Sequence, residues 1–173
     1  MTKYSSSSSY STYEAIIASL MILGIGIVIA SSLEMIWTKV FSVFISIGII
    51  VLIILYQRKK TFDIKFSENG IIIEYPFLNK TDQVPYTDLV QIQFISAYRA
   101  PNRNKIKFKI DGKIESLRFL TVAQSDQYIE FIKWLKSKND KLELKVFPSD
   151  HIMNHKIQEV YGFKYRKILK KIL

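Results

Sequence analysis

Two long apolar runs near the start of the chain constrain its fold more than any other feature. Ala15 to Leu33 form a stretch of 19 residues without a charged side chain, and Val40 to Leu55 form a second uncharged run. A helix of 19 residues is roughly 28 Å long, close to the thickness of the hydrocarbon core of a bilayer. Because only a short polar break separates the runs, the sequence predicts a transmembrane helical hairpin over residues 14–56.

The charges that flank the hairpin predict its orientation. Arg58, Lys59 and Lys60 follow the second run directly, whereas the loop between the runs carries one acid, Glu34, and one base, Lys39. Positive charge is enriched on the cytoplasmic side of membrane helices. We therefore expect a multi-pass protein of the inner (cytoplasmic) membrane with both termini in the cytoplasm.

A cleaved signal peptide is an alternative interpretation of the first run. Lys3 would be its weak positive region, and small residues near Ala30 and Ser31 would be its cleavage site. The second run would then remain as the anchor in the same orientation.

A serine-rich segment precedes the first run. The unbroken run Ser5 to Ser9 cannot bury a core, so residues 1–13 are predicted to be a disordered tail.

Small residues recur four apart within the two apolar runs, at Gly26 and Ala30 and at Ser42 and Ser46. This spacing allows close helix approach, so the hairpin is expected to pack on itself or on a second copy in a homo-oligomer, unless the spacing is accidental.

Beyond residue 56 the hydrophobic pattern changes from helical to alternating. Phe62, Ile64 and Phe66 alternate with polar residues, and tight turns are predicted at Asn69-Gly70 and Asp111-Gly112. This pattern predicts six short antiparallel strands, with a basic loop over residues 98–104. They are expected to form one small α+β domain over residues 57–140.

Two helical segments are predicted after the strands. An amphipathic helix begins in a capping box at Thr121 and ends at Lys138. Residues 141–147 alternate again and form a last strand or an extended connector. A helix start at Pro148 then leads into a basic amphipathic segment, with Gly162 as a candidate interruption, and residues 141–173 are expected to be an extension of the domain.

The net charge of +10 lies entirely beyond residue 56, because two bases offset two acids before it. Such an excess favours anionic partners, and the inner leaflet of a membrane is one. Lysines on one face of the second predicted hairpin form a cationic stripe, although an ordinary solvated strand face has the same pattern. The candidate residues for contact with a membrane surface or an anionic ligand are Arg99, Arg103, Lys105, Lys107, Lys109, Lys164, Arg166, Lys167, Lys170 and Lys171.

The order of these elements resembles bacterial membrane proteins with a pleckstrin-homology-like (YcxB-like) domain. The resemblance runs from Ala15 to about Lys138 and includes the stretches Phe66 to Ile71 and Val84 to Leu89. It implies a bent antiparallel sheet or barrel of about seven strands capped by a C-terminal helix, tethered to the membrane and without enzymatic activity. The sequence supplies six strands before that helix. The phosphoinositide site of the wider superfamily does not carry over, because the turn from Ser67 to Gly70 has an acid and no base.

No motif of the sequence predicts catalysis or a cofactor. There are no cysteines, and neither a nucleophile with a nearby base nor a glycine-rich phosphate loop is recognisable. His151 and His155 are four apart on a predicted helix, but a third metal ligand is not evident, so a solvent-facing pair is favoured.

We expect a non-catalytic module at the membrane that binds lipid or an unidentified protein. The alternatives are a membrane-anchored immunity protein against a toxin and a nucleic-acid-binding protein. The latter is disfavoured because the lysine stripe has no interleaved aromatic platform.

Overall fold

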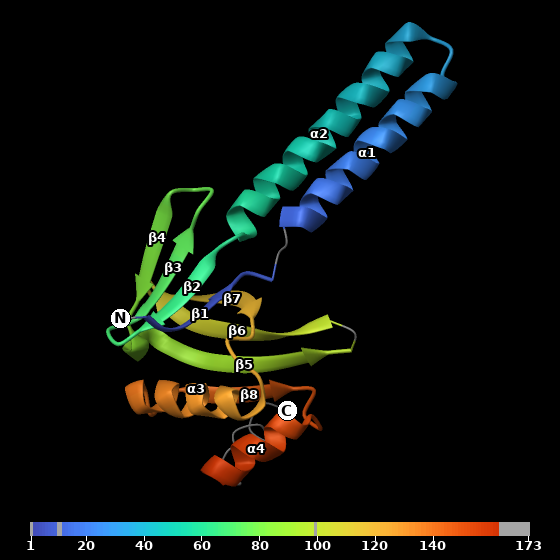
Figure 1. The fold of residues 1–173 in the computed structure, drawn as a ribbon. Coiled ribbons are helices and arrows are strands. Elements are labelled where there is room, and N and C mark those ends of the chain that lie inside the picture. Colours follow the sequence, from blue (N-terminus) through green and yellow to red (C-terminus); the bar gives the residue numbers. More distant parts are fainter. Residues whose placement is uncertain (1, 10–11, 99, 163–173) are drawn as a thin grey trace. The chain divides into compact units, whose positions relative to one another are not determined.

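A computed structural model describes residues 2–9, 12–98 and 100–162 (Figure 1). The chain divides into two compact units, one of residues 10–62 with 74–80, and the other of residues 1–9, 63–73 and 81–173. The described elements are β1 (Thr2–Ser7), α1 (Thr12–Ser32), α2 (Ile36–Lys60), β2 (Asp63–Ser67), β3 (Ile71–Tyr75), β4 (Lys80–Val84), the short 3-10 helix η1 (Tyr86–Asp88), β5 (Leu89–Ala97), β6 (Ala100–Ile110), β7 (Lys113–Leu120), α3 (Ser125–Lys138), β8 (Glu143–Phe147) and α4 (Ile152–Tyr161).

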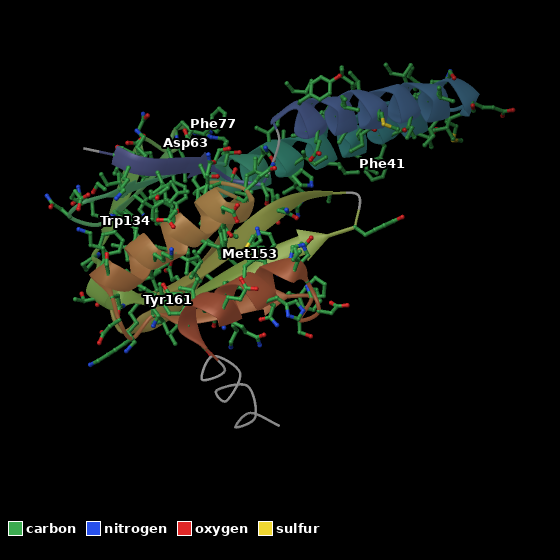
Figure 2. The ribbon with its side chains drawn as sticks, turned by 60° about the horizontal axis from the view of Figure 1, so that its bottom comes forward. Phe41, Asp63, Phe77, Trp134, Met153 and Tyr161 are labelled. Atoms are coloured by element: carbon green, nitrogen blue, oxygen red, sulfur yellow. The ribbon has the colours of Figure 1, made fainter. Side chains whose placement is uncertain are left out.

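The two apolar runs form two helices that pack side by side, and both are long and apolar enough to cross a membrane. Only 6% of the most apolar window of each helix is buried. Large apolar side chains instead face outward, as Phe41 does with 66% of its surface exposed (Figure 2). An uninterrupted apolar surface of this kind is suited to lipid rather than to water.

Small residues hold the two helices together. A Cβ atom added to Gly26 would lie 2.1 Å from Ser46 Oγ, and the Ser42 hydroxyl donates to the carbonyl of Gly26 at 3.4 Å. The prediction that the hairpin packs on itself through these residues is confirmed. The contact depends on the missing side chain of Gly26, because any larger residue would push the helices apart.

The other unit contains two four-stranded sheets, apart from the tip of the β3–β4 hairpin at residues 74–80. The first has the order β1-β2-β3-β4, and the second has the order β7-β6-β5-β8. The described strands form two open sheets and not the closed barrel that the resemblance allowed. Phe66 of β2 lies 5.9 Å from Phe119 of β7 and 5.0 Å from Phe131 of α3, measured between ring centroids. The core therefore lies where both sheets and α3 meet.

The Ser-rich N-terminal segment is ordered in the structure, so the prediction of a disordered tail is wrong for residues 2–8. Thr2 to Ser7 form β1, which pairs antiparallel with β2. The ring of Tyr4 packs 4.9 Å from Phe131 and 5.4 Å from Trp134, and Ser8 is buried. The serine-rich composition predicted disorder, but serine hydroxyls can also form hydrogen bonds with backbone carbonyls inside a folded domain. The Ser6 hydroxyl donates such a bond to the carbonyl of Leu120.

Three smaller expectations also change. The predicted basic loop is mostly strand, since β6 begins at Ala100. The predicted capping box does not start α3, which begins at Ser125, and the Thr121 hydroxyl donates to the carbonyl of Ala123 instead. With β1, seven described strands precede α3, one more than the sequence predicted.

The segment after α3 continues the second sheet. Glu143 to Phe147 form β8, which pairs in parallel with β5. The last described helix, α4, ends at Tyr161, and Gly162 follows it with a φ of 70°. The helix starts four residues after Pro148, where the sequence predicted a start, and its end coincides with Gly162, where the sequence predicted an interruption.

We predict that replacing Tyr4 with alanine lowers the free energy of unfolding by roughly 1–2 kcal/mol, because the ring contacts two aromatic side chains of α3. Urea unfolding in detergent, followed by Trp134 fluorescence in a Trp37→Phe background, measures this change. Ser5→Ala, at an exposed position of the same strand, should leave the transition within about 0.5 kcal/mol. Equal effects of the two substitutions would argue against an ordered β1.

We also predict that Gly26→Ala destabilises the helix pair by about 1–3 kcal/mol, because its methyl group overlaps the side chain of Ser46. The control is Gly24→Ala, where an added Cβ has no neighbour within 4 Å. Both changes raise helix propensity equally, so their difference isolates the contact. A thermal melt of the helical circular dichroism signal in detergent compares them, and identical melts would contradict the packing.

Candidate functional site

The second sheet has one face in the core and one face outside it. Phe94 of β5 lies on the core face, where its ring is 5.0 Å from Tyr128 of α3 and 5.3 Å from His151 at the start of α4. Both helices therefore cover the same face of this sheet (Figure 2). The alternate residues of its four strands point to the opposite, outer face.

The register of the strands brings cations together on this outer face. Lys145 of β8 lies beside Gln93 of β5, which lies beside Lys105 of β6, which in turn lies opposite Arg118 of β7. Lys107 follows on the same face of β6. We call this set the cationic sheet face, and its members are Lys105, Lys107, Arg118 and Lys145.

The electrostatics of the cationic sheet face are unfavourable in the protein alone. Burial lowers the pKa of Lys105 below its ordinary value, and the nearby charges of Arg118 and Lys107 lower it further. Lys145 pairs with Glu143 at 3.1 Å, but within the described part of the chain Lys105, Lys107 and Arg118 have no carboxylate at ion-pair distance. Like charges directly opposite each other weaken a strand pair. A bound anion would remove this repulsion.

An apolar row lies next to the cationic sheet face, toward the tip of the β5–β6 hairpin. Phe147, Ile95, Arg103 and Leu120 are neighbours across the four strands. Phe147 is 60% exposed, and the Nε atom of Arg103 is buried without an acceptor among the described residues. Over one step of the strands the outer face therefore changes from cationic to mostly apolar, with Arg103 as the charged residue of this row.

The structure brings together some of the residues that the sequence singled out. Arg103, Lys105, Lys107 and Lys109 share one face of β6, but Lys109 lies at its far end, opposite Ile114. The remaining candidates fall outside the described residues, and they are Arg99, Lys164, Arg166, Lys167, Lys170 and Lys171. Lys156, which begins the basic C-terminal segment, forms an ion pair with Asp126 of α3 at 2.7 Å.

Sequence reasoning missed Arg118 and Lys145. Arg118 was within reach, because the two-residue turn at Asp111-Gly112 fixes the register of the hairpin and sets Arg118 opposite Lys105. Lys145 was not, because β8 pairs in parallel with a strand far away in the sequence and no local signal encodes that pairing.

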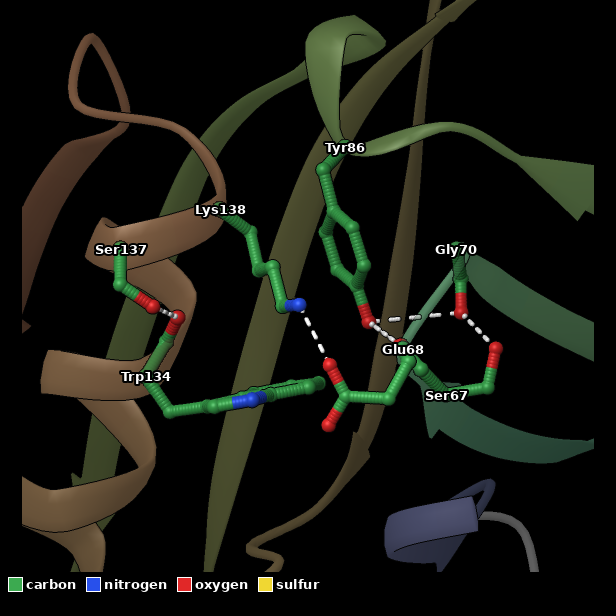
Figure 3. A network of polar contacts seen from close by, with 7 residues as sticks. All are labelled: Ser67, Glu68, Gly70, Tyr86, Trp134, Ser137 and Lys138. Atoms are coloured by element: carbon green, nitrogen blue, oxygen red, sulfur yellow. Dashed lines mark hydrogen bonds and ion pairs between the residues drawn. The ribbon is translucent and has the colours of Figure 1, made fainter. Parts of the chain in front are cut away.

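A second polar cluster joins the β2–β3 turn to the end of α3 (Figure 3). The Tyr86 hydroxyl donates to the carbonyls of Ser67 and Gly70 at 2.7 and 3.3 Å, and burial raises the pKa of Tyr86 far above its ordinary value. Glu68 accepts from Lys138 at 2.5 Å, and the ring of Trp134 lies edge-on to Tyr86 at 5.6 Å. Each polar group is engaged inside the protein, so this cluster is structural.

The histidine pair has separate surroundings in the structure. The Nδ1 atom of His151 accepts from the backbone N–H of Met153 at 3.1 Å and so caps α4, whereas His155 is exposed. Among the described residues, no group of three or more His, Cys, Asp or Glu side chains could hold a metal ion.

We predict that Lys105→Gln stabilises the protein by up to about 1 kcal/mol at low salt, because it removes a cation directly opposite Arg118. The gain should shrink as salt screens the repulsion. Lys109→Gln, on the same strand but opposite an isoleucine, is the matched control and should be nearly neutral. Urea unfolding at two salt concentrations measures both. A loss of stability in Lys105→Gln would show that Lys105 has a structural partner.

Comparison of the chain with protein-family models and with curated proteins finds no match.

Proposed function

We propose that the protein is a non-catalytic, membrane-anchored pleckstrin-homology-like module whose cationic sheet face contacts anionic lipid headgroups. The observation that carries this proposal is the like-charged group Lys105, Lys107 and Arg118 on the outer face of the second sheet, which has no carboxylate at ion-pair distance among the described residues. A protein that maintains such repulsion gives up stability, and an anionic surface restores it.

The order of the elements supports the pleckstrin-homology-like assignment. Seven strands in two sheets precede α3, and α3 packs on the core between them through Phe131 and Tyr128. The pattern of the sequence predicted six strands before this helix, and the seventh strand is β1, which precedes the helical hairpin. The added β8 and α4 extend this arrangement.

Strand pairing supports a two-span anchor over a cleaved signal peptide. β1 precedes α1 and β2 follows α2, yet the two strands pair with each other. This pairing supports a membrane arrangement in which the chain segments before and after the helices lie on the same side, as in a two-span anchor. Cleavage near Ala30 would remove β1 together with Tyr4. The basic residues at the end of α2 favour the cytoplasmic side of a bacterial inner membrane.

The composition of the outer face favours a lipid surface among anionic partners. Each cation near an anionic leaflet contributes about 1 kcal/mol, and the adjoining apolar row offers side chains for the headgroup boundary. Tethering by the two helices keeps this face at a high effective concentration next to lipid. Tethering therefore allows a small number of cations, which would bind lipid only weakly in a free domain, to contribute to membrane contact.

We predict that a fluorescent probe on Ser116, which is exposed beside Lys107, approaches the bilayer only when anionic lipid is present. The chain has no cysteine, so Ser116→Cys gives a single labelling site in the full-length protein. Quenchers carried by lipids should quench the probe in vesicles with phosphatidylglycerol and not in neutral vesicles, and added salt should reverse the quenching.

Two controls sharpen this experiment. A probe attached through His155→Cys, at an exposed position of α4, reports any approach of the domain to the membrane that does not involve the cationic sheet face. The substitutions Lys105→Gln and Arg118→Gln together should abolish quenching at Ser116. Equal quenching in neutral and anionic vesicles, or none in either, would overturn the lipid assignment, and in the second case an acidic protein becomes the partner that fits the same charges.

A further inference from the structure

The tip of the β3–β4 hairpin, residues 74–80, forms one compact unit with the two long helices. The guanidinium of Arg58, near the end of α2, donates from Nη2 to the carbonyl of Phe77 at 2.9 Å. The ring of Tyr75 in the tip also packs at a tilt of 53° against Phe62, which follows α2, with ring centroids 5.9 Å apart. The tip is therefore held beside the basic end of α2.

The position of Arg58 sets the depth of this tip. Arg58 is the first charged residue after the long uncharged stretch of α2, so in a bilayer its guanidinium lies at the level of the headgroups. Phe77 is bonded to it and is 43% exposed, so this aromatic side chain lies at the same level. Aromatic side chains at that depth are typical of membrane interfaces.

A cleft of about 340 Å³ opens between the helices and the tip. Its apolar wall includes Ile16, Leu20, Ile54 and Phe77, and its polar groups include Gln57 and Arg58. The described residues that line it include no acidic side chain. The volume is within the range of small-molecule sites.

The polar groups of the cleft have donors to spare. A guanidinium has five N–H donors in a planar fork, and the bond to Phe77 uses one. The Nε2 atom of Gln57 is buried and has no acceptor among the described residues. Donors without acceptors beside an apolar wall fit a ligand that has a phosphate at one end and a hydrocarbon chain at the other.

We propose that this cleft binds one phospholipid molecule, with its phosphate on Arg58 and Gln57 and an acyl chain along Ile16, Leu20 and Ile54. The inference rests on the proposed insertion of the two helices into a membrane, and it is separate from lipid contact by the cationic sheet face. Phe77 covers the chain on the side of the tip. Free phosphate is a poor occupant, because it leaves the apolar wall without a partner.

Native mass spectrometry of the full chain in detergent tests the site by counting phospholipid retained after titration with phosphatidylglycerol. The wild-type protein should retain one molecule that inorganic phosphate does not displace. Arg58→Gln should weaken retention about tenfold or more, as expected when a charge-assisted bond is lost. Lys59→Gln removes the neighbouring charge, which does not line this cleft, and should behave like the wild type.

A second variant fills the cleft and leaves Arg58 in place. Ser19 lines the cleft, and Ser19→Phe should displace the acyl chain and abolish retention. Wild-type retention in both Arg58→Gln and Ser19→Phe would overturn the site. Displacement of the bound molecule by inorganic phosphate would show that the ligand is a free anion and would overturn it as well.

Alkaline carbonate extraction of membranes separates this inference from the proposed function. If the chain resists extraction but retains no phospholipid in detergent, the cleft is not a lipid site and the anchor stands. If the chain is extracted, the helices do not span a membrane and the proposal for the cleft fails with them.

Discussion

The pairing of β1 with β2 is the constraint on which the rest of the structure depends. These strands lie on either side of two long apolar helices in the sequence, and their register sets Tyr4 beside Phe66. Phe66 in turn contacts Phe119 and Phe131, so the pair that joins the ends of the hairpin also leads into the core. Burial of these rings, together with the ladder of backbone hydrogen bonds, offsets the entropy of closing a loop around the helices.

Charged side chains stabilise this protein on one surface, where opposite charges pair, and destabilise it on another, where like charges face each other. At the β2–β3 turn, Glu68 meets Lys138, and Lys138 also lies 5.9 Å from the ring centre of Trp134. On the cationic sheet face, Lys105 meets Arg118 instead. Since both surfaces belong to the same small unit, the contrast cannot be attributed to overall composition. It comes from the placement of individual residues, since the charges at the turn pair within the protein whereas Lys105 and Arg118 face each other.

Much of the fold could be predicted from local pattern, and the rest depends on pairings without a local signal. The long apolar runs gave two helices, and the turns at Asn69-Gly70 and Asp111-Gly112 gave hairpins near their observed positions. The strand β1 was missed because its second half, Ser5 to Ser7, is all serine, and within the strand only Tyr4 places a large side chain in the interior. The cationic sheet face was half predicted, because β6 alternates visibly, whereas Lys145 reaches it only through the parallel pairing of β8 with β5.

The N-terminal position of β1 makes biosynthesis part of the folding problem. This strand leaves the ribosome before its partner β2, which follows roughly 60 residues later, about 3–12 s at synthesis rates of ~5–20 residues per second. Two long apolar helices lie between these strands, so β1 can pair with β2 only after both helices have been synthesised. If the helices span a membrane as proposed, a chain inserted with only one span would leave β1 and β2 on opposite sides and could not complete the first sheet.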